Sequence, residues 1–109
     1  MLNKQIIINN VRFKNRISVS PMCQYSSSNG CPSNWHYSHL RNLIETGAGS
    51  ITIESTAVSS IGRITKKDLC LYNYKHLISH KKLVTYLKNI RNIPIILQIS
   101  HSGRKGSAE

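Results

Sequence analysis

The sequence predicts an α/β fold built on a parallel sheet, and three observations lead to that prediction. Short β-branched segments alternate with two segments of helical periodicity, which is the order that parallel βαβ units produce. Residues 95–99 form a nearly continuous apolar run, typical of a strand covered on both faces. The chain has 109 residues, which suffices for one small domain.

A hairpin is the first expected element. Its strands, residues 5–8 and 11–14, flank Asn9 and Asn10, a pair that tolerates the positive φ angles of a tight turn. A short strand at 17–20 follows and stops at Pro21, because proline has no N–H for a sheet ladder.

Two helices and two further strands come next. Residues 26–34 are rich in Ser, Asn and Gly and predict a loop that provides Ser33 or Asn34 as N-cap. The apolar spacing then predicts a helix over about 35–46, and β-branched residues predict a strand over 50–54.

The second half repeats this pattern. We expect residues 55–74 to be irregular and residues 75–92 to be helical, with Leu83 and Leu87 four residues apart on one face. The strand at 95–99 is followed by a tail without an expected helix. Three parallel strands with two helices leave open edges and one poorly covered sheet face.

Charge and cysteine content limit the classes of protein. Fifteen Lys and Arg residues against four Asp and Glu residues give a net charge of +11, so an anionic partner must be considered. Three cysteines cannot form a complete set of disulfides, which favours a cytoplasmic protein with free thiols. The first twenty residues contain no apolar run long enough for a signal peptide or a membrane span.

One hypothesis is therefore a small basic module that binds nucleic acid or another anionic surface. Its main support is the helical segment 75–92, which carries five basic residues and no acidic residue. Against it, aromatic residues make up only 6% of the chain and no recognised nucleic-acid motif is present. A general compositional bias toward basic residues explains the charge more simply.

Polar or reactive residues follow each strand of the expected parallel sheet. In such folds ligands bind outside the carboxyl ends of the strands. The three segments that end strands are Ser20-Pro21-Met22-Cys23-Gln24-Tyr25, Glu54-Ser55-Thr56, and residues 98–104 with the pattern Gln-x-x-His-x-Gly-Arg.

These segments, with Gly-Arg-Ile-Thr at 62–65 and His-Tyr-Ser-His at 36–39, resemble the old yellow enzyme family. The similarity is strongest to the FMN-containing, NAD(P)H-dependent ene-reductases that carry a cysteine in the first motif. It extends from about residue 6 to residue 109.

The resemblance implies a (β/α)8 barrel, which takes ~250 residues. This chain, as one unit over 1–109 without a second domain, would supply the N-terminal hairpin, two βα units and the third parallel strand. In such an enzyme NADH or NADPH reduces FMN, which then passes hydride to an activated alkene. The substrate anchors and phosphate loops belong to later strands, so we expect the isolated chain to be inactive. An oligomer is possible for the full-length family.

The resemblance also implies site residues. The residues expected to line FMN are Ser20, Pro21, Met22, Cys23, Ser55 and Gln98. Cys23 would tune the redox centre, and Tyr25 would face the substrate. Ser55 stands where this branch usually has alanine.

The residue types permit these roles and also structural ones. The Gln98 amide can pair with the pyrimidine edge of a flavin, because it offers both a donor and an acceptor. Alternatively, Gln98 is a polar residue on a strand, Cys23 is a small buried apolar residue and Tyr25 merely packs.

The histidines do not suggest a metal site. His36 and His39 are three residues apart with no third ligand. His76 and His80 lack the glutamate of a metalloprotease helix, and we expect them to be solvated on the surface.

Overall fold

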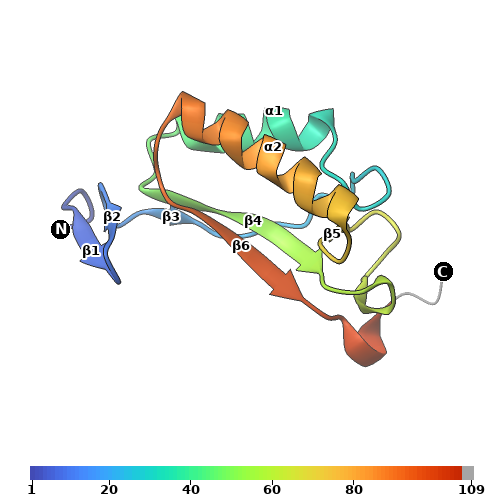
Figure 1. The fold of residues 1–109 in the computed structure, drawn as a ribbon. Coiled ribbons are helices and arrows are strands. Elements are labelled where there is room, and N and C mark those ends of the chain that lie inside the picture. The colour runs from blue at the N-terminus through green and yellow to red at the C-terminus, as the bar shows by residue number, and fades with distance from the viewer. Residues whose placement is uncertain (107–109) are drawn as a thin grey trace.

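The computed structural model describes residues 1–106 and shows two layers. Helices α1 (Asn34–Glu45) and α2 (Tyr74–Ile90) lie side by side on one face of a parallel sheet (Figure 1). Among the described residues no helix covers the opposite face. The predicted α/β class and the poorly covered face are therefore both confirmed.

Strand β4 (Ser50–Ala57) is the centre of the sheet. β3 (Ser18–Val19) and β5 (Leu69–Cys70) pair with opposite ends of one of its edges, and β6 (Ile95–Ser100) pairs with the other edge. All of these pairings are parallel, as the alternation of strands and helices predicted.

The segment 55–74 was expected to be irregular, and this prediction is partly wrong. β4 continues through residue 57, and β5 forms two residues of strand inside the segment. A two-residue strand is too short to show alternating hydrophobicity, so it leaves no pattern in the sequence. The short 3₁₀ helix η1 (Ser60–Gly62) occupies part of the remaining segment.

The hairpin forms as predicted. β1 (Ile6–Ile8) pairs antiparallel with β2 (Val11–Phe13). Asn9 and Asn10 both have positive φ, 48° and 66°, as the favoured two-residue hairpin turn requires. A cleft of about 370 Å³ separates the hairpin from the amino end of the sheet's open face.

The helices begin close to the predicted positions. Ser33 is the N-cap of α1, and its backbone N–H donates to Nδ1 of His36. Asn73 caps α2, and its side chain accepts from the backbone N–H of His76. In the predicted tail, a 3₁₀ turn, η2 (Gly103–Lys105), follows β6. Residues 107–109 of that tail lie outside the described part of the chain.

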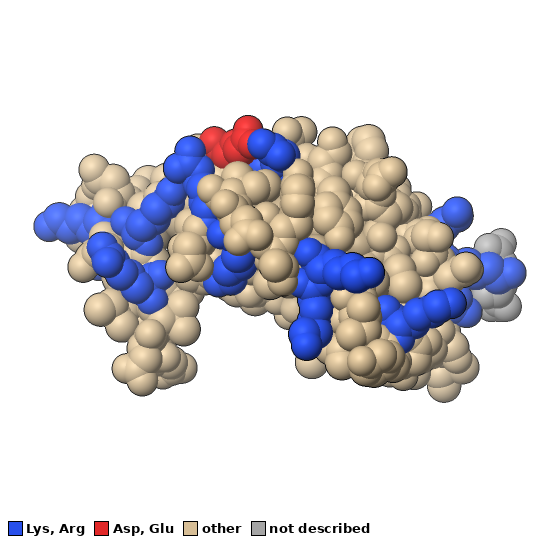
Figure 2. All heavy atoms as spheres, turned by 45° about the horizontal axis from the view of Figure 1, so that its top comes forward, with Lys and Arg blue, Asp and Glu red and all other residues tan. Residues whose placement is uncertain are grey.

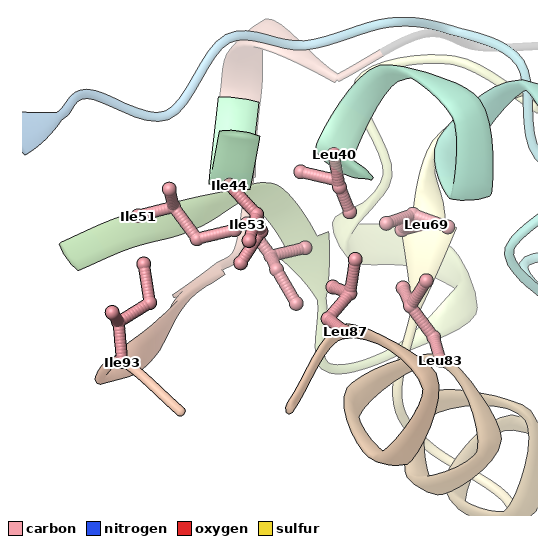
Figure 3. Packing of buried hydrophobic residues seen from close by; sticks show 8 residues of the cluster. All are labelled: Leu40, Ile44, Ile51, Ile53, Leu69, Leu83, Leu87 and Ile93. Carbon is pink, nitrogen blue, oxygen red and sulfur yellow. The ribbon is translucent and has the colours of Figure 1, made fainter. Parts of the chain in front are cut away.

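The hydrophobic core lies between the helices and the covered face of the sheet. Alternate residues of β4 point toward the helices (Figure 3) because side chains of a strand alternate between its faces. Each fully buried Leu or Ile contributes about 1.5–3 kcal/mol through removal of apolar surface from water. The eight core residues are Leu40, Ile44, Ile51, Ile53, Leu69, Leu83, Leu87 and Ile93.

Candidate functional site

The predicted site lies at the carboxyl end of the sheet, where the ladder between β4 and β6 is irregular. Ile53 pairs with Leu97 and Thr56 pairs with Ile99, so that two residues of β4 stand opposite one residue of β6. Such a bulge redirects side chains locally. It places Glu54 and Ser55 opposite Gln98.

Gln98 lies on the uncovered side of the sheet. Its neighbours Ile95 and Leu97 pack against the core, so the alternation of strand side chains puts Gln98 on the other face. The residue is exposed, and no side-chain hydrogen bond among residues 1–106 engages its amide. A free donor and acceptor are thus presented together on the open face.

The segment 20–23 reaches the same end of the sheet. It follows β3, and the backbone N–H of Gln24 donates to Oε2 of Glu54 at 3.2 Å. Met22 is 49% exposed, and Cys23 is half-buried. Cys23 is therefore not the fully buried apolar residue of the alternative interpretation.

Tyr25 stands on the rim beside Cys23 and is 46% exposed. The pKa of the Tyr25 hydroxyl is raised, mainly by electrostatic repulsion from Cys23 and secondly by partial loss of solvent around it. Like an ordinary tyrosine hydroxyl, it is protonated at neutral pH and can donate a hydrogen bond. Its backbone has a φ of 50°, which is uncommon for a large side chain.

Ser55 is buried, and its hydroxyl bonds the hydroxyl of Ser100 on β6. This bond links the carboxyl ends of the two strands. The hydroxyl is therefore already engaged within the sheet. The expected contact of Ser55 with a flavin stays a prediction.

A buried pair beside these residues was not expected from the sequence. Nε2 of His36 lies 3.3 Å from Oε1 of Glu54, and both side chains are almost completely buried. One signal in the sequence points to such a pair, because a carboxylate within an apolar strand needs a partner.

The expectation that His76 and His80 are solvated is wrong. Both are buried where α2 meets the loops of the sheet. His76 uses both ring nitrogens: Nδ1 accepts from the N–H of Tyr72, and Nε2 bonds the carbonyl of Asn29. Nε2 of His80 bonds the carbonyl of Cys70 at 3.1 Å. These histidines join secondary-structure elements.

Other kinds of site receive no support from the described residues. Within residues 1–106, no three His, Cys, Asp or Glu side chains are grouped to hold a metal ion. In the same part of the chain, neither helix has the length and apolar character needed to span a bilayer. The three cysteines are free thiols.

The residues at the carboxyl end fit the flavin that the resemblance implies. The Gln98 amide, whose side chain bonds no other described residue, matches the donor and acceptors of a flavin edge. The accessible segment 20–23 borders the same open face, and Ser55 is small enough for a planar ring to approach. Fold and site together indicate the N-terminal part of a parallel α/β barrel whose candidate ligand-binding residues lie at the carboxyl ends of the strands.

Comparison with known proteins identifies the family. The sequence pattern of the NADH:flavin oxidoreductase / NADH oxidase family matches residues 2–109, and the chain belongs to this family. It is 38% identical over 102 residues to an NADH:flavin oxidoreductase of Gibberella zeae, covering 94% of this chain. It is 40% identical over 100 residues to an NADPH dehydrogenase of Bacillus cytotoxicus, covering 90% of this chain.

Solved structures of the family share the fold. The old yellow enzyme homologue from Zymomonas mobilis superposes with a TM-score of 0.87 over 98% of this chain, at 18% sequence identity. The chain spans 24% and 29% of the two curated relatives and 30% of this structure. The fold is thus the first part of a (β/α)8 barrel.

Proposed function

We propose that residues 20–23, Ser55 and Gln98 form one wall of the FMN site in an NAD(P)H-dependent ene-reductase, with Tyr25 facing the substrate. The observation that carries the proposal is the exposed Gln98 amide opposite the β4 bulge, which has no hydrogen-bond partner among residues 1–106. A ligand that covered the open face would bury this amide, and a flavin edge offers the hydrogen-bonding groups that the amide then requires.

Each part of the wall has a separate role. Gln98 binds the pyrimidine edge of the ring, while the segment Ser20–Cys23 lies along the ring and places a polarizable thiol near its reactive edge. Tyr25 presents a protonated hydroxyl to the substrate. Bound FMN supplies hydride transfer from NADH or NADPH to an activated alkene.

The alternative of a nucleic-acid-binding module requires a continuous cationic face. On the face seen in Figure 2, Lys and Arg side chains lie in separate groups over the hairpin, the helices and the far end of the molecule. Within the described residues, the polar groups that converge at the strand ends are mostly uncharged. We therefore prefer the flavin site.

A chimeric enzyme tests the proposal directly. Residues 1–109 replace the matching N-terminal segment of the Bacillus cytotoxicus NADPH dehydrogenase, whose remaining barrel then completes the fold. We expect the purified chimera to contain FMN, measured by its visible absorbance after heat release. Gln98→Leu should lower the FMN affinity roughly tenfold, because a buried hydrogen-bonding edge of the ring loses its partner.

The matched control is Gln5→Leu, the same change at an exposed glutamine of the hairpin. It should leave FMN affinity unchanged. A chimera that is folded by circular dichroism but binds no FMN would contradict the proposal, and so would equal affinities of the Gln98→Leu and parent chimeras.

A further inference from the structure

We propose that Glu54 is a positioning residue that holds the loop carrying Cys23 and Tyr25 at the edge of the site. The importance of this loop for a reaction rests on the proposed function. The restraint itself rests on the hydrogen bonds and burial of Glu54.

The Glu54 carboxylate joins the loop to a helix. One oxygen accepts the backbone N–H of Gln24, and the other bonds Nε2 of His36 near the start of α1. Only 5% of Glu54 is exposed. A buried carboxylate is costly unless its oxygens are satisfied, and here each oxygen has a donor.

The direction of the bond from His36 is set by its other nitrogen. Nδ1 accepts the backbone N–H of Ser33 at 3.0 Å, so the ring proton of a neutral histidine resides on Nε2. Nε2 then donates to Glu54. The start of α1, the bulge of β4 and the loop are consequently connected through one carboxylate.

The same loop is held from its other side. The Gln24 side chain accepts from Nε1 of Trp35 and donates to the carbonyl of Met22, each at 2.9 Å. Ser33 also donates from its hydroxyl to the carbonyl of Ser26. The bond from Trp35 ties the Gln24 side chain to the start of α1. The bond to Glu54 ties the Gln24 backbone to β4.

Tyr25 shows why the loop needs such restraint. Its left-handed backbone conformation costs about 1–2 kcal/mol relative to ordinary conformations. A residue in this region persists only where surrounding contacts determine it. Gln24 lies between Cys23 and Tyr25 in the chain. A fixed Gln24 amide therefore positions the side chains of both neighbours.

Glu54→Gln tests the inference in the full chain. Glutamine keeps the size but has one acceptor and one donor group, so it cannot accept from both Gln24 and His36. The reaction of each cysteine with iodoacetamide is followed by peptide mass mapping. Cys31 serves as an internal reference, while burial raises the pKa of Cys70 and keeps its thiol unreactive.

We expect Glu54→Gln to accelerate alkylation of Cys23 roughly tenfold, the scale of losing a charged hydrogen bond. The Cys31 rate should stay the same. The control Glu45→Gln removes a carboxylate from an exposed pair on α1 and should change neither rate. Unchanged Cys23 reactivity, or equal acceleration of both cysteines, would overturn the inference.

A second measurement needs no variant. Hydrogen exchange in the unsubstituted chain should show a Gln24 amide that is protected, although it lies in a loop. Exchange at the rate of an open loop would overturn the inference even if Glu54→Gln does not fold. Neither measurement involves flavin, so their outcome is independent of the chimera experiment that tests the proposed function.

Discussion

Gly30 lies in the loop before α1, packed tightly against β5 and α2. Its φ is 86°, and a Cβ there would lie 2.6 Å from Nε2 of His76 and 2.7 Å from Cβ of Cys70. The backbone carbonyl of Gly30 also accepts from the N–H of Cys70. Both the left-handed conformation and the lack of space therefore require glycine at this position.

Gly30→Ala should destabilise the protein more than Gly47→Ala does. Gly47 has a similar φ of 91° but nothing within 4 Å of its added Cβ, so its substitution costs only the conformational strain of about 1–2 kcal/mol. Overlap at Gly30 adds about 1–3 kcal/mol. Urea unfolding measures the difference, and equal losses for the two variants would contradict the packing argument.

At the residue scale, motifs identified positions but not all of their roles. The segment Ser20–Tyr25 and Gln98 lie at the carboxyl end of the sheet, where they were predicted. The buried bond between His36 and Glu54 was missed, because these residues are 18 apart in the chain. Only the packing of α1 against β4 brings them together.

At the scale of elements, buried histidines connect α2 to the sheet. His80 lies on α2, and its ring bonds the carbonyl of Cys70 in β5. Burial lowers the pKa of His80, opposed by this bond and reinforced by nearby His76 and His36. The neutral ring is therefore the form that joins the two elements.

This arrangement predicts acid sensitivity. Because the folded-state pKa lies below the ordinary 6.5, the unfolded chain takes up a proton first as the pH falls. The stability contributed by neutral His80 is complete above pH 6.5, and it is lost progressively as the pH falls toward the lower folded-state pKa. The free energy of unfolding should fall by up to about 1.4 kcal/mol per pH unit for this group.

Urea unfolding at about pH 7.5 and about pH 5.5 measures the effect. His80→Gln should lose much of the difference between the two conditions, since glutamine does not titrate. His39→Gln, the same change on the half-exposed face of α1, is the control and should behave like the unsubstituted protein. A pH difference that persists in His80→Gln would exclude His80 as its source.

The sequence pattern located the helices more accurately than the shortest strand. Both helices were predicted within two residues at either end, because their apolar spacing and caps are local signals. β5 has two residues and depends on β4 for its hydrogen bonds. The buried positions of His76 and His80 depend in turn on β5 and the Gly30 loop.

For the whole molecule, the open side of the sheet is the feature with the greatest physical consequence. Ile96 on β6 is 42% exposed, and in residues 1–106 β6 pairs only with β4. An exposed strand edge beside apolar side chains is a template for pairing with another chain. The net charge of +11 opposes this association, and salt weakens that opposition.

We therefore expect the protein to self-associate increasingly with concentration and ionic strength in sedimentation velocity. Ile96→Lys should shift it toward the monomer by placing charge on the open face. Leu77→Lys introduces the same charge at a helix position of matching exposure, 43%, and should have little effect. A monodisperse monomer in high salt would contradict the expectation that this face associates.

The sequence by itself determined the class of fold, the order of the elements, the hairpin turn and the family, since these depend on local periodicity and on motifs. Only the tertiary structure decided which residues meet: Gln98 opposite the β4 bulge, Glu54 between Gln24 and His36, and the two α2 histidines against the loops of the sheet. Such contacts join residues far apart in the chain, and they follow from sheet register and helix packing rather than from local pattern.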